Sequence, residues 1–357
     1  MKTRLSVVVP AFNEGHRLQG GLSQLLDGLS SDDTEILVVD DGSTDNTAAV
    51  ARRQLAAWPQ HSVVSLPRNS GKGAAVRAGV VRARGDVIAF VDADMATDPR
   101  DLGALVGTLK SNDVAVGSRT HDSSLVDERS SYRTAMTQTF GLVVNTLMHL
   151  PIGDTQCGFK AFRGPVAKLL FHGSRVDRWA FDVEVLNLAT RLGLRIQEVP
   201  VRWSEVSGSH IRPFRDGVQM IADVARTRQT WRVQPPMQGV FLPEVPVEPA
   251  IALIRPWTRS VDLSISWKGG TAVLFPCAPP TTAGRITKRL LKALRTYDPQ
   301  ALSVDFDVLL RTGSWTGDSW RQALPHTLPE PDDDPAVSVE LDALSRAFTS
   351  MAVVRRE

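Results

Sequence analysis

The chain has 357 residues, of which 42% are hydrophobic and 22% are charged, and its formal net charge is +2. This composition is that of a globular protein, not of a disordered or fibrous one, and the length leaves room for two domains. The nearly balanced charge gives no support for nucleic-acid binding, which usually requires a strongly basic face.

Short apolar runs alternate with amphipathic stretches over the first 120 residues. The apolar runs predict strands at Leu5–Pro10, Glu35–Asp40, Ser62–Leu66, Val87–Asp92 and Asp113–Gly117. The intervening stretches predict helices at Gly15–Leu29, Thr44–Ala57, Gly71–Ala83 and Pro99–Lys110. This alternation predicts β-α-β units, and therefore an α/β fold whose mostly parallel central sheet is covered on both sides.

The pattern is more mixed after residue 120. We expect helices at Ser131–Leu150, Ala180–Leu192 and Phe214–Trp231, and a strand at Arg195–Val201. Six prolines between Gln234 and Pro256 then favour an extended connector, and weaker strand and helix patterns follow it. We therefore predict a catalytic domain over residues 1–235, a Pro-rich linker over 236–257, and a small α+β domain of unknown role over 258–357.

The compartment is suggested by two negative features. The two cysteines, Cys157 and Cys277, form neither a disulfide framework nor a zinc pattern, which favours a reducing, cytoplasmic environment. No run reaches the 18 apolar residues that a membrane-spanning helix needs, so any membrane contact is expected to be peripheral, on the inner face.

The sharpest chemical motif is Phe90-Val91-Asp92-Ala93-Asp94, at the end of the predicted fourth strand. Ligands of open α/β sheets bind outside the carboxyl ends of the strands. Carboxylates two apart on an extended strand point to the same side, where their repulsion is relieved if a cation joins them. Such oxygen ligands suit Mg²⁺ or Mn²⁺, which commonly hold a diphosphate. Asp92 and Asp94 are therefore the predicted metal ligands.

Three further motifs follow the first three predicted strands. They are Pro10-Ala11-Phe12-Asn13-Glu14, Asp40-Asp41-Gly42-Ser43-Thr44-Asp45 and Asn69-Ser70-Gly71-Lys72-Gly73. Glu14 could simply favour a helix N-terminus, and Ser43 or Thr44 could be ordinary helix caps. A carboxylate such as Asp41 can instead accept hydrogen bonds from a nucleobase or a ribose, and Lys72 can offset the charge of a diphosphate.

Together these motifs resemble the family 2 glycosyltransferases with the GT-A fold. Three strings in the second half narrow the resemblance to the dolichyl-phosphate β-glucosyltransferases: Asp154-Thr155-Gln156-Cys157-Gly158-Phe159-Lys160, Arg178-Trp179-Ala180-Phe181-Asp182-Val183-Glu184 and Glu198-Val199-Pro200-Val201-Arg202-Trp203. The dolichyl-phosphate mannose synthases are more distantly similar. The resemblance covers roughly residues 4–232.

The resemblance implies an inverting transfer of glucose from UDP-glucose to a polyprenyl phosphate. It implies donor-binding roles for Pro10, Phe12, Glu14, Val39, Asp41, Lys72, Asp92, Ala93 and Asp94. It implies acceptor-binding roles for Arg119, Arg133, Arg202 and His210. Asp94 and Asp154 are the catalytic candidates, although Asp154 could instead be a structural carboxylate bonded to backbone N–H groups or to an arginine.

Two positions depart from the related families. Ala96 stands where mannose synthases can carry a metal-contacting Gln, and His210 stands where the glucosyltransferases carry Lys. A neutral His binds phosphate less well, so a soluble transferase acting on a hydroxyl of a small molecule or glycan is the alternative. A second alternative is a nucleotide-sugar-binding protein without turnover, whose C-terminal domain recruits a protein partner.

Overall fold

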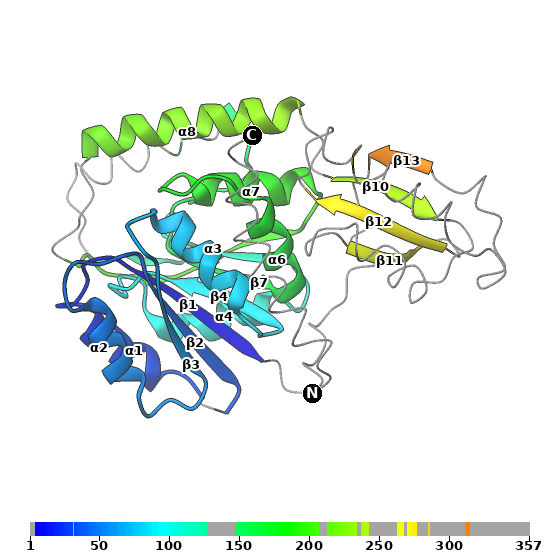
Figure 1. Ribbon diagram of the computed structural model, residues 1–357. Coiled ribbons are helices and arrows are strands. Elements are labelled where there is room, and N and C mark those ends of the chain that lie inside the picture. The colour runs from blue at the N-terminus through cyan, green and yellow to red at the C-terminus, as the bar shows by residue number, and fades with distance from the viewer. Residues whose placement is uncertain are drawn as a thin grey trace. The chain divides into compact units, whose positions relative to one another are not determined.

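The computed structural model describes residues 4–30, 32–126, 147–206, 213–233, 237–242, 263–267, 270–276 and 311–314, with the single positions 141, 144 and 285 (Figure 1). Contacts between residues divide the chain into two compact units. The first comprises mainly Met1–Thr190 and Leu194–Thr230, and the second comprises mainly Trp231–Pro325 and Pro329–Glu357. The candidate site lies in the first unit.

A seven-stranded sheet forms the centre of the first unit, in the order β3-β2-β1-β4-β7-β5-β8. Its strands are β1 (Leu5–Ala11), β2 (Thr34–Asp40), β3 (His61–Ser65), β4 (Val87–Val91), β5 (Val114–Ser118), β7 (Phe159–Arg163) and β8 (Ile196–Pro200). All are parallel except β7, which pairs antiparallel with both β4 and β5. The predicted mostly parallel α/β sheet is therefore confirmed.

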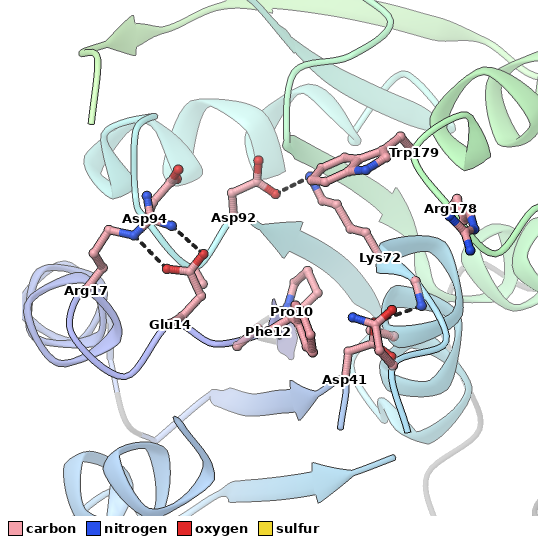
Figure 2. A pocket seen from close by; sticks show the side chains of 15 residues that line it. Pro10, Phe12, Glu14, Arg17, Asp41, Lys72, Asp92, Asp94, Arg178 and Trp179 are labelled. Atoms are coloured by element: carbon pink, nitrogen blue, oxygen red, sulfur yellow. Dashed lines mark hydrogen bonds and ion pairs between the residues drawn. The ribbon is translucent and has the colours of Figure 1, made fainter. Parts of the chain in front are cut away.

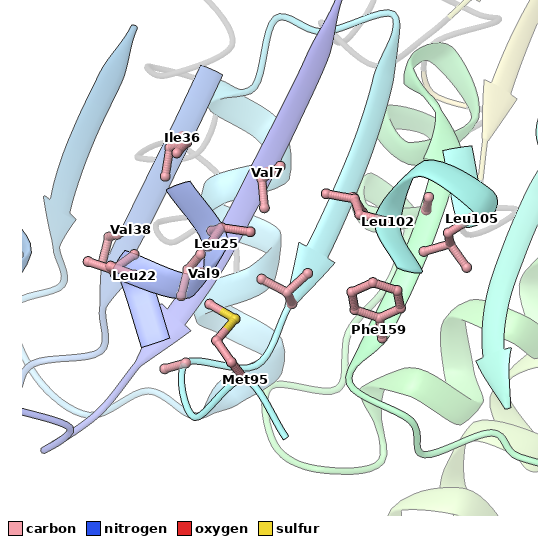
Figure 3. Close-up of a cluster of buried hydrophobic side chains, with 14 of the residues drawn as sticks. Val7, Val9, Leu22, Leu25, Ile36, Val38, Met95, Leu102, Leu105 and Phe159 are labelled. Atoms are coloured by element: carbon pink, nitrogen blue, oxygen red, sulfur yellow. The ribbon is translucent and has the colours of Figure 1, made fainter. Parts of the chain in front are cut away.

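One face of the sheet packs on α1 (Leu18–Asp27), α2 (Thr47–Leu55), η1 (Pro99–Asp101) and α4 (Leu102–Thr108). Alternate residues of β1 reach this layer, where Val7 and Val9 join Leu22, Leu25 and Leu105 in one apolar cluster (Figure 3). All five side chains are fully buried. The period of two in the strand and the apolar stripe of each helix account for this packing.

The opposite face packs on α3 (Lys72–Arg82), α6 (Gly164–Gly173) and α7 (Phe181–Arg191). A cluster of fully buried phenylalanines fills this layer, with ring centroids 5.6–6.4 Å apart: Phe90, Phe162, Phe171 and Phe181. Gly79 allows α3 to approach β1 closely, since a Cβ there would lie 2.3 Å from Val8 Cγ1. Helices thus cover both faces, as the alternating sequence predicts.

The remaining elements are shorter or lie near the end of the first unit. The strands β6 (Leu125–Val126) and β9 (Arg202–Trp203) pair in parallel, and α8 spans Pro213–Val233. Most of the helix predicted at Ser131–Leu150 lies outside the described residues. None of the described helices is both long enough and apolar enough to cross a membrane.

The second unit contains a four-stranded antiparallel sheet in the order β11-β12-β10-β13. Its strands are β10 (Met237–Leu242), β11 (Leu263–Trp267), β12 (Gly270–Pro276) and β13 (Arg311–Ser314). The strand β10 falls inside the range predicted as a linker, so residues 237–242 form part of a sheet instead of an extended connector. The domain boundaries at residues 235 and 257 stay a prediction.

Candidate functional site

A cavity of about 240 Å³ opens at the carboxyl ends of β1, β2 and β4 (Figure 2). The chain segments that line it are the loops following β1, β2, β3 and β4, the start of α3, and the loop that precedes α7. Its lining residues include Pro10, Phe12, Glu14, Arg17, Asp41, Asn69, Gly71, Lys72, Asp92, Ala93, Asp94, Arg178 and Trp179. Eight of the nine predicted donor-binding residues therefore meet in one cavity, at the edge of the sheet where ligands of α/β proteins bind.

Asp92 and Asp94 follow β4 directly and both line this cavity. They alternate with Ala93 and Met95, which are buried in the core, in a turn that Met95 N closes by donating to Asp92 O at 3.1 Å. Burial and the neighbouring Asp92 charge raise the pKa of Asp94 above its ordinary value. The charge of Asp92 thus disfavours the ionised form of Asp94, a repulsion that a bound cation relieves.

Lys72 faces this pair from the first turn of α3. Its Nζ atom lies 2.5 Å from Asp92 Oδ1 and 5.5 Å from the ring centroid of Trp179. Burial alone would lower the pKa of Lys72, but the nearby carboxylates of Asp92 and Asp182 outweigh it and raise that pKa. Lys72 is therefore a fixed cation beside the acidic pair, where a diphosphate would need positive charge (Figure 2).

The two carboxylates fit a divalent ion. They are hard oxygen donors, and Mg²⁺ and Mn²⁺ sites that hold a diphosphate commonly use one or two protein carboxylates. Within the described part of the chain, no group of three or more acidic, His or Cys side chains surrounds one point. Such an ion would therefore take its other ligands from water and from the substrate.

Gly158 fixes the position of the Asp92 carboxylate from the opposite side. A Cβ atom at residue 158 would lie 2.0 Å from Asp92 Oδ2 and 2.1 Å from Asp92 Cγ, so only glycine leaves room for this side chain. The backbone is tied at the same point, because Asp92 N donates to Gly158 O at 3.0 Å. The Cys-Gly-Phe-Lys string is therefore part of the carboxylate site, a role that sequence reasoning missed.

The Asp41 end of the cavity is built from backbone hydrogen bonds. The carboxylate of Asp41 accepts from Ser70 N and Gly71 N, each at 2.8 Å, which joins the end of β2 to the start of α3. Burial, and then repulsion from Asp40, raise the pKa of Asp41 despite these two hydrogen bonds. Gly71 has a φ of 105°, and a Cβ there would lie 2.4 Å from Asp177 O.

The turn after β2 has a different role from helix capping. The helix α2 begins at Thr47, its N-cap is Asn46, and Thr47 N donates to Asp45 Oδ1 at 2.9 Å. Ser43 Oγ instead accepts a hydrogen bond from Asn13 N at 2.9 Å, and Asn13 Oδ1 accepts from Thr44 N at 2.9 Å. The capping alternative for Ser43 and Thr44 is therefore wrong, because these residues join the loops that follow β1 and β2.

Two predicted donor residues have contacts that sequence alone does not reveal. Glu14 lines the cavity and accepts from Arg17 Nε at 2.7 Å and Nη2 at 2.6 Å, so its charge is paired. Val39 is fully buried in β2, and its side chain faces Gly79 of α3. The predicted contact between Val39 and a nucleoside stays a prediction.

Asp154 and Arg119 form a buried pair on the acceptor side of the predicted site. The Asp154 carboxylate accepts from Arg119 Nε at 2.6 Å, from Nη2 at 2.8 Å, from Arg119 N at 3.0 Å and from Gln156 N at 3.3 Å. Burial would raise the pKa of Asp154, but Arg119 lowers it to about 2. These contacts favour the structural alternative for Asp154, with Arg119 as its arginine partner.

Of the other three predicted acceptor residues, the structure describes only Arg202. The guanidinium of Arg202 pairs with Asp101 Oδ1, at 2.9 Å from Nε and 2.5 Å from Nη2, and it is 39% exposed. Arg119 lies 6.0 Å from the ring centroid of Trp203, the residue after Arg202. Arg133 and His210 lie outside the described residues. Their predicted contact with an acceptor stays a prediction.

Lys160 and Asp182 form an ion pair in the interior that sequence reasoning missed. Lys160 is 1% exposed, and its Nζ donates to Asp182 Oδ1 at 2.7 Å and to Cys157 O at 2.6 Å. Glu184 instead accepts from Arg175 N at 2.7 Å and Val176 N at 2.8 Å. Cys157 is buried, and burial raises the pKa of its thiol to about 11.

Comparison with known proteins gives independent evidence on the family. The model of "Glycosyl transferase family 2" matches residues 6–168. The dolichyl-phosphate β-glucosyltransferase of Dictyostelium discoideum is 39% identical over 240 residues, which are 63% of this chain and 73% of that protein. The human dolichyl-phosphate β-glucosyltransferase is 36% identical over 255 residues, which are 65% of this chain and 78% of that protein.

A solved structure shares the fold. It is glucosyl-3-phosphoglycerate synthase from Mycobacterium tuberculosis in complex with Mn²⁺, UDP and glucosyl-3-phosphoglycerate. The two proteins are 20% identical with a TM-score of 0.50, and the match covers 77% of this chain and 88% of that one. At this identity the likeness concerns the fold. It also shows that Mn²⁺ and UDP bind together in a related structure of this architecture.

Proposed function

Because the chain belongs to glycosyl transferase family 2 and is a glycosyltransferase of the GT-A fold, we propose that it transfers glucose from UDP-glucose to a polyprenyl phosphate such as dolichyl phosphate, with inversion at the anomeric carbon. The observation that carries the proposal is the arrangement of Asp92, Asp94 and Lys72 in one cavity. The 39% identity to a dolichyl-phosphate β-glucosyltransferase supports the choice of sugar and acceptor.

Asp92 and Asp94 are the proposed ligands of a Mg²⁺ or Mn²⁺ ion. When bound, such an ion acts as a Lewis acid that neutralises the charge growing on the departing diphosphate. The Mn²⁺ and UDP named for the related M. tuberculosis structure support this choice. Lys72, whose Nζ contacts Asp92, would add a second positive charge beside the same diphosphate.

The nucleoside would lie along the loops that follow β1 and β2. Pro10 and Phe12 supply apolar surface there, and the Asp41 carboxylate supplies hydrogen-bond acceptors. Two backbone N–H groups hold this carboxylate, and they leave it lone pairs for a uracil N–H or a ribose hydroxyl. These contacts would position the donor, and positioning accounts for a large part of catalysis in a displacement of this kind.

The hydrogen bonds and the lowered pKa of Asp154 bear on whether the acceptor is a phosphate or a hydroxyl. A hydroxyl needs a general base to remove its proton, whereas a phosphate monoester has a second pKa of about 6 and is largely ionised at neutral pH. Asp154, with four N–H contacts and a pKa of about 2, is poorly suited to be that base. This favours an acceptor that arrives already ionised, and we propose the lipid phosphate over the soluble hydroxyl.

We further propose that the protein meets the lipid acceptor as a peripheral membrane protein on the cytoplasmic side. An exposed apolar side chain, Leu125, lies beside Arg202 through the pairing of β6 with β9. An apolar group next to an acceptor-binding arginine is suited to an isoprenoid phosphate. Sedimentation with vesicles that contain polyprenyl phosphate, against vesicles that lack it, would measure this contact.

A panel of UDP- and GDP-sugars with polyprenyl phosphate tests the function, in Mg²⁺, in Mn²⁺ and in chelator. We expect UDP-glucose to give a product that partitions into organic solvent and carries the inverted anomeric configuration, with no turnover in chelator. A water-soluble product would favour the hydroxyl acceptor. Turnover that resists the chelator would refute the metal assignment, and UDP-glucose binding with neither transfer nor hydrolysis would support a non-catalytic protein.

A further inference from the structure

A second, smaller cleft lies on the other side of Asp92 from the donor cavity. Its lining includes Asp92, Thr97, Arg119, Gln156, Gly158 and Trp203. Asp92 lines both hollows, so a group in the small cleft lies next to the proposed metal and diphosphate site. On the proposed function, an acceptor in this cleft would lie beside the donor.

Gln156 lines this cleft and carries an unused hydrogen-bond donor. Its Nε2 atom is buried and has no hydrogen-bond partner among the described residues. Arg119 lines the same cleft, and its contacts with Asp154 use Nε, Nη2 and the backbone N–H, leaving Nη1 without a partner among those residues. A buried donor without a partner is costly, so a ligand that accepts from both side chains would recover that cost.

Hydrogen bonds on either side hold the backbone around Gln156. Gln156 N donates to Asp154 Oδ1 at 3.3 Å, and the next carbonyl, that of Cys157, accepts from the buried Lys160 at 2.6 Å. The two donors meet little uncompensated negative charge, because Lys72 pairs with Asp92 at 2.5 Å. A ligand that only accepts hydrogen bonds, such as a phosphoryl oxygen, matches this arrangement better than a hydroxyl.

We propose that Gln156 is a specificity-determining residue, whose side-chain amide donates a hydrogen bond to a phosphoryl oxygen of the acceptor beside Arg119. This inference rests on the proposed transfer to a polyprenyl phosphate, and it adds a residue to which no role has been given. The amide supplies the second donor of a phosphate site whose first donor is a guanidinium.

The test compares Gln156→Met, which removes the donor, with Gln156→Glu, which keeps the shape and adds a negative charge. Gln60→Glu is the matched control, because Gln60 is exposed and lies just before β3, at the far edge of the sheet. The readouts are the KM for polyprenyl phosphate at saturating UDP-glucose and Mn²⁺, the Kd of UDP by calorimetry, and the melting temperature. A hydrogen bond to a charged group predicts a rise in acceptor KM of roughly 10- to 100-fold for Gln156→Met.

We expect a larger rise for Gln156→Glu, with the UDP Kd changed less than about twofold and the control unaffected. Unchanged acceptor KM in both folded variants would overturn the inference, and so would equal losses in the two variants. A change in UDP-glucose KM alone would place Gln156 on the donor sugar instead. Wild-type protein that gives no product with polyprenyl phosphate would overturn the proposed function itself, which separates the two failures.

Discussion

Replacing Gly158 by alanine is expected to disable the acidic pair while leaving the fold in place. The added Cβ would lie 2.0 Å from Asp92 Oδ2, whereas ordinary contacts begin at 3.4 Å, so the carboxylate must retreat. A misplacement of roughly 1 Å in a catalytic group can cost about 100-fold in rate, which corresponds to about 2.7 kcal/mol. We therefore expect kcat/KM for glucose transfer to fall about 100-fold and the affinity for Mn²⁺ to weaken.

The control for this change is Gly107→Ala, in α4. A Cβ at residue 107 would meet no atom within 4 Å, so this variant should keep full activity. Transfer of labelled glucose gives the rate, electron paramagnetic resonance gives free Mn²⁺ and hence its affinity, and thermal melting reports the fold. If Gly158→Ala kept kcat/KM within about threefold of wild type and bound Mn²⁺ normally, the reasoning that Gly158 positions Asp92 would be refuted.

Three further predictions concern charges in and around the site. Asp94→Asn removes a carboxylate whose pKa is raised by burial and by Asp92, so urea unfolding in chelator should show a more stable protein. Transfer activity should fall by more than the roughly 10- to 100-fold that is typical when a residue supporting a metal site is lost. Lys160→Met leaves Asp182 buried without its cation and should lower the free energy of unfolding by about 3–5 kcal/mol, whereas Lys160→Met with Asp182→Leu should recover most of this loss. Asp154 has a folded-state pKa of about 2 against 3.8 in the unfolded chain, so its stabilisation is present above pH 4 and is lost as the pH falls toward 2. The difference in unfolding free energy between wild type and Asp154→Asn should then narrow by up to about 2 kcal/mol from pH 5 to pH 2 in urea titrations, and a constant difference would argue against the ion pair with Arg119.

The acidic pair could be predicted from sequence because the features that define it are local. The apolar run Val87–Val91 gives the buried strand β4, and the two aspartates follow it directly, in the turn at the edge of the sheet. The same holds for Asp41 after β2 and for Lys72 at the start of α3. The sheet places these strand ends at one edge, so the cavity follows from the strand order once the fold is known.

The strand at Phe159–Arg163, β7, could not be predicted from local sequence features. Lys160 and Arg163 resemble surface residues in sequence, but both are buried in β7. Lys160 pairs with Asp182, 22 residues away, and Arg163 pairs with Asp113, 50 residues away. A charge whose partner is so distant gives no local pattern, and for this reason the strand was missed.

The antiparallel direction of β7 explains why the short segment that precedes it, residues 154–158, contacts both Asp92 and Arg119. A parallel strand between β4 and β5 would send the residues that precede it to the opposite edge of the sheet. Because β7 runs the other way, Phe159 pairs with Val91, and the residues just before β7 meet the residues just after β4. Asp154 then orients Arg119, Gln156 lines the small cleft, and Gly158 holds Asp92. The reversal of this single strand therefore brings Asp92 and Asp94, the proposed metal ligands, to the same edge of the sheet as Arg119 and Gln156, the proposed acceptor-binding residues.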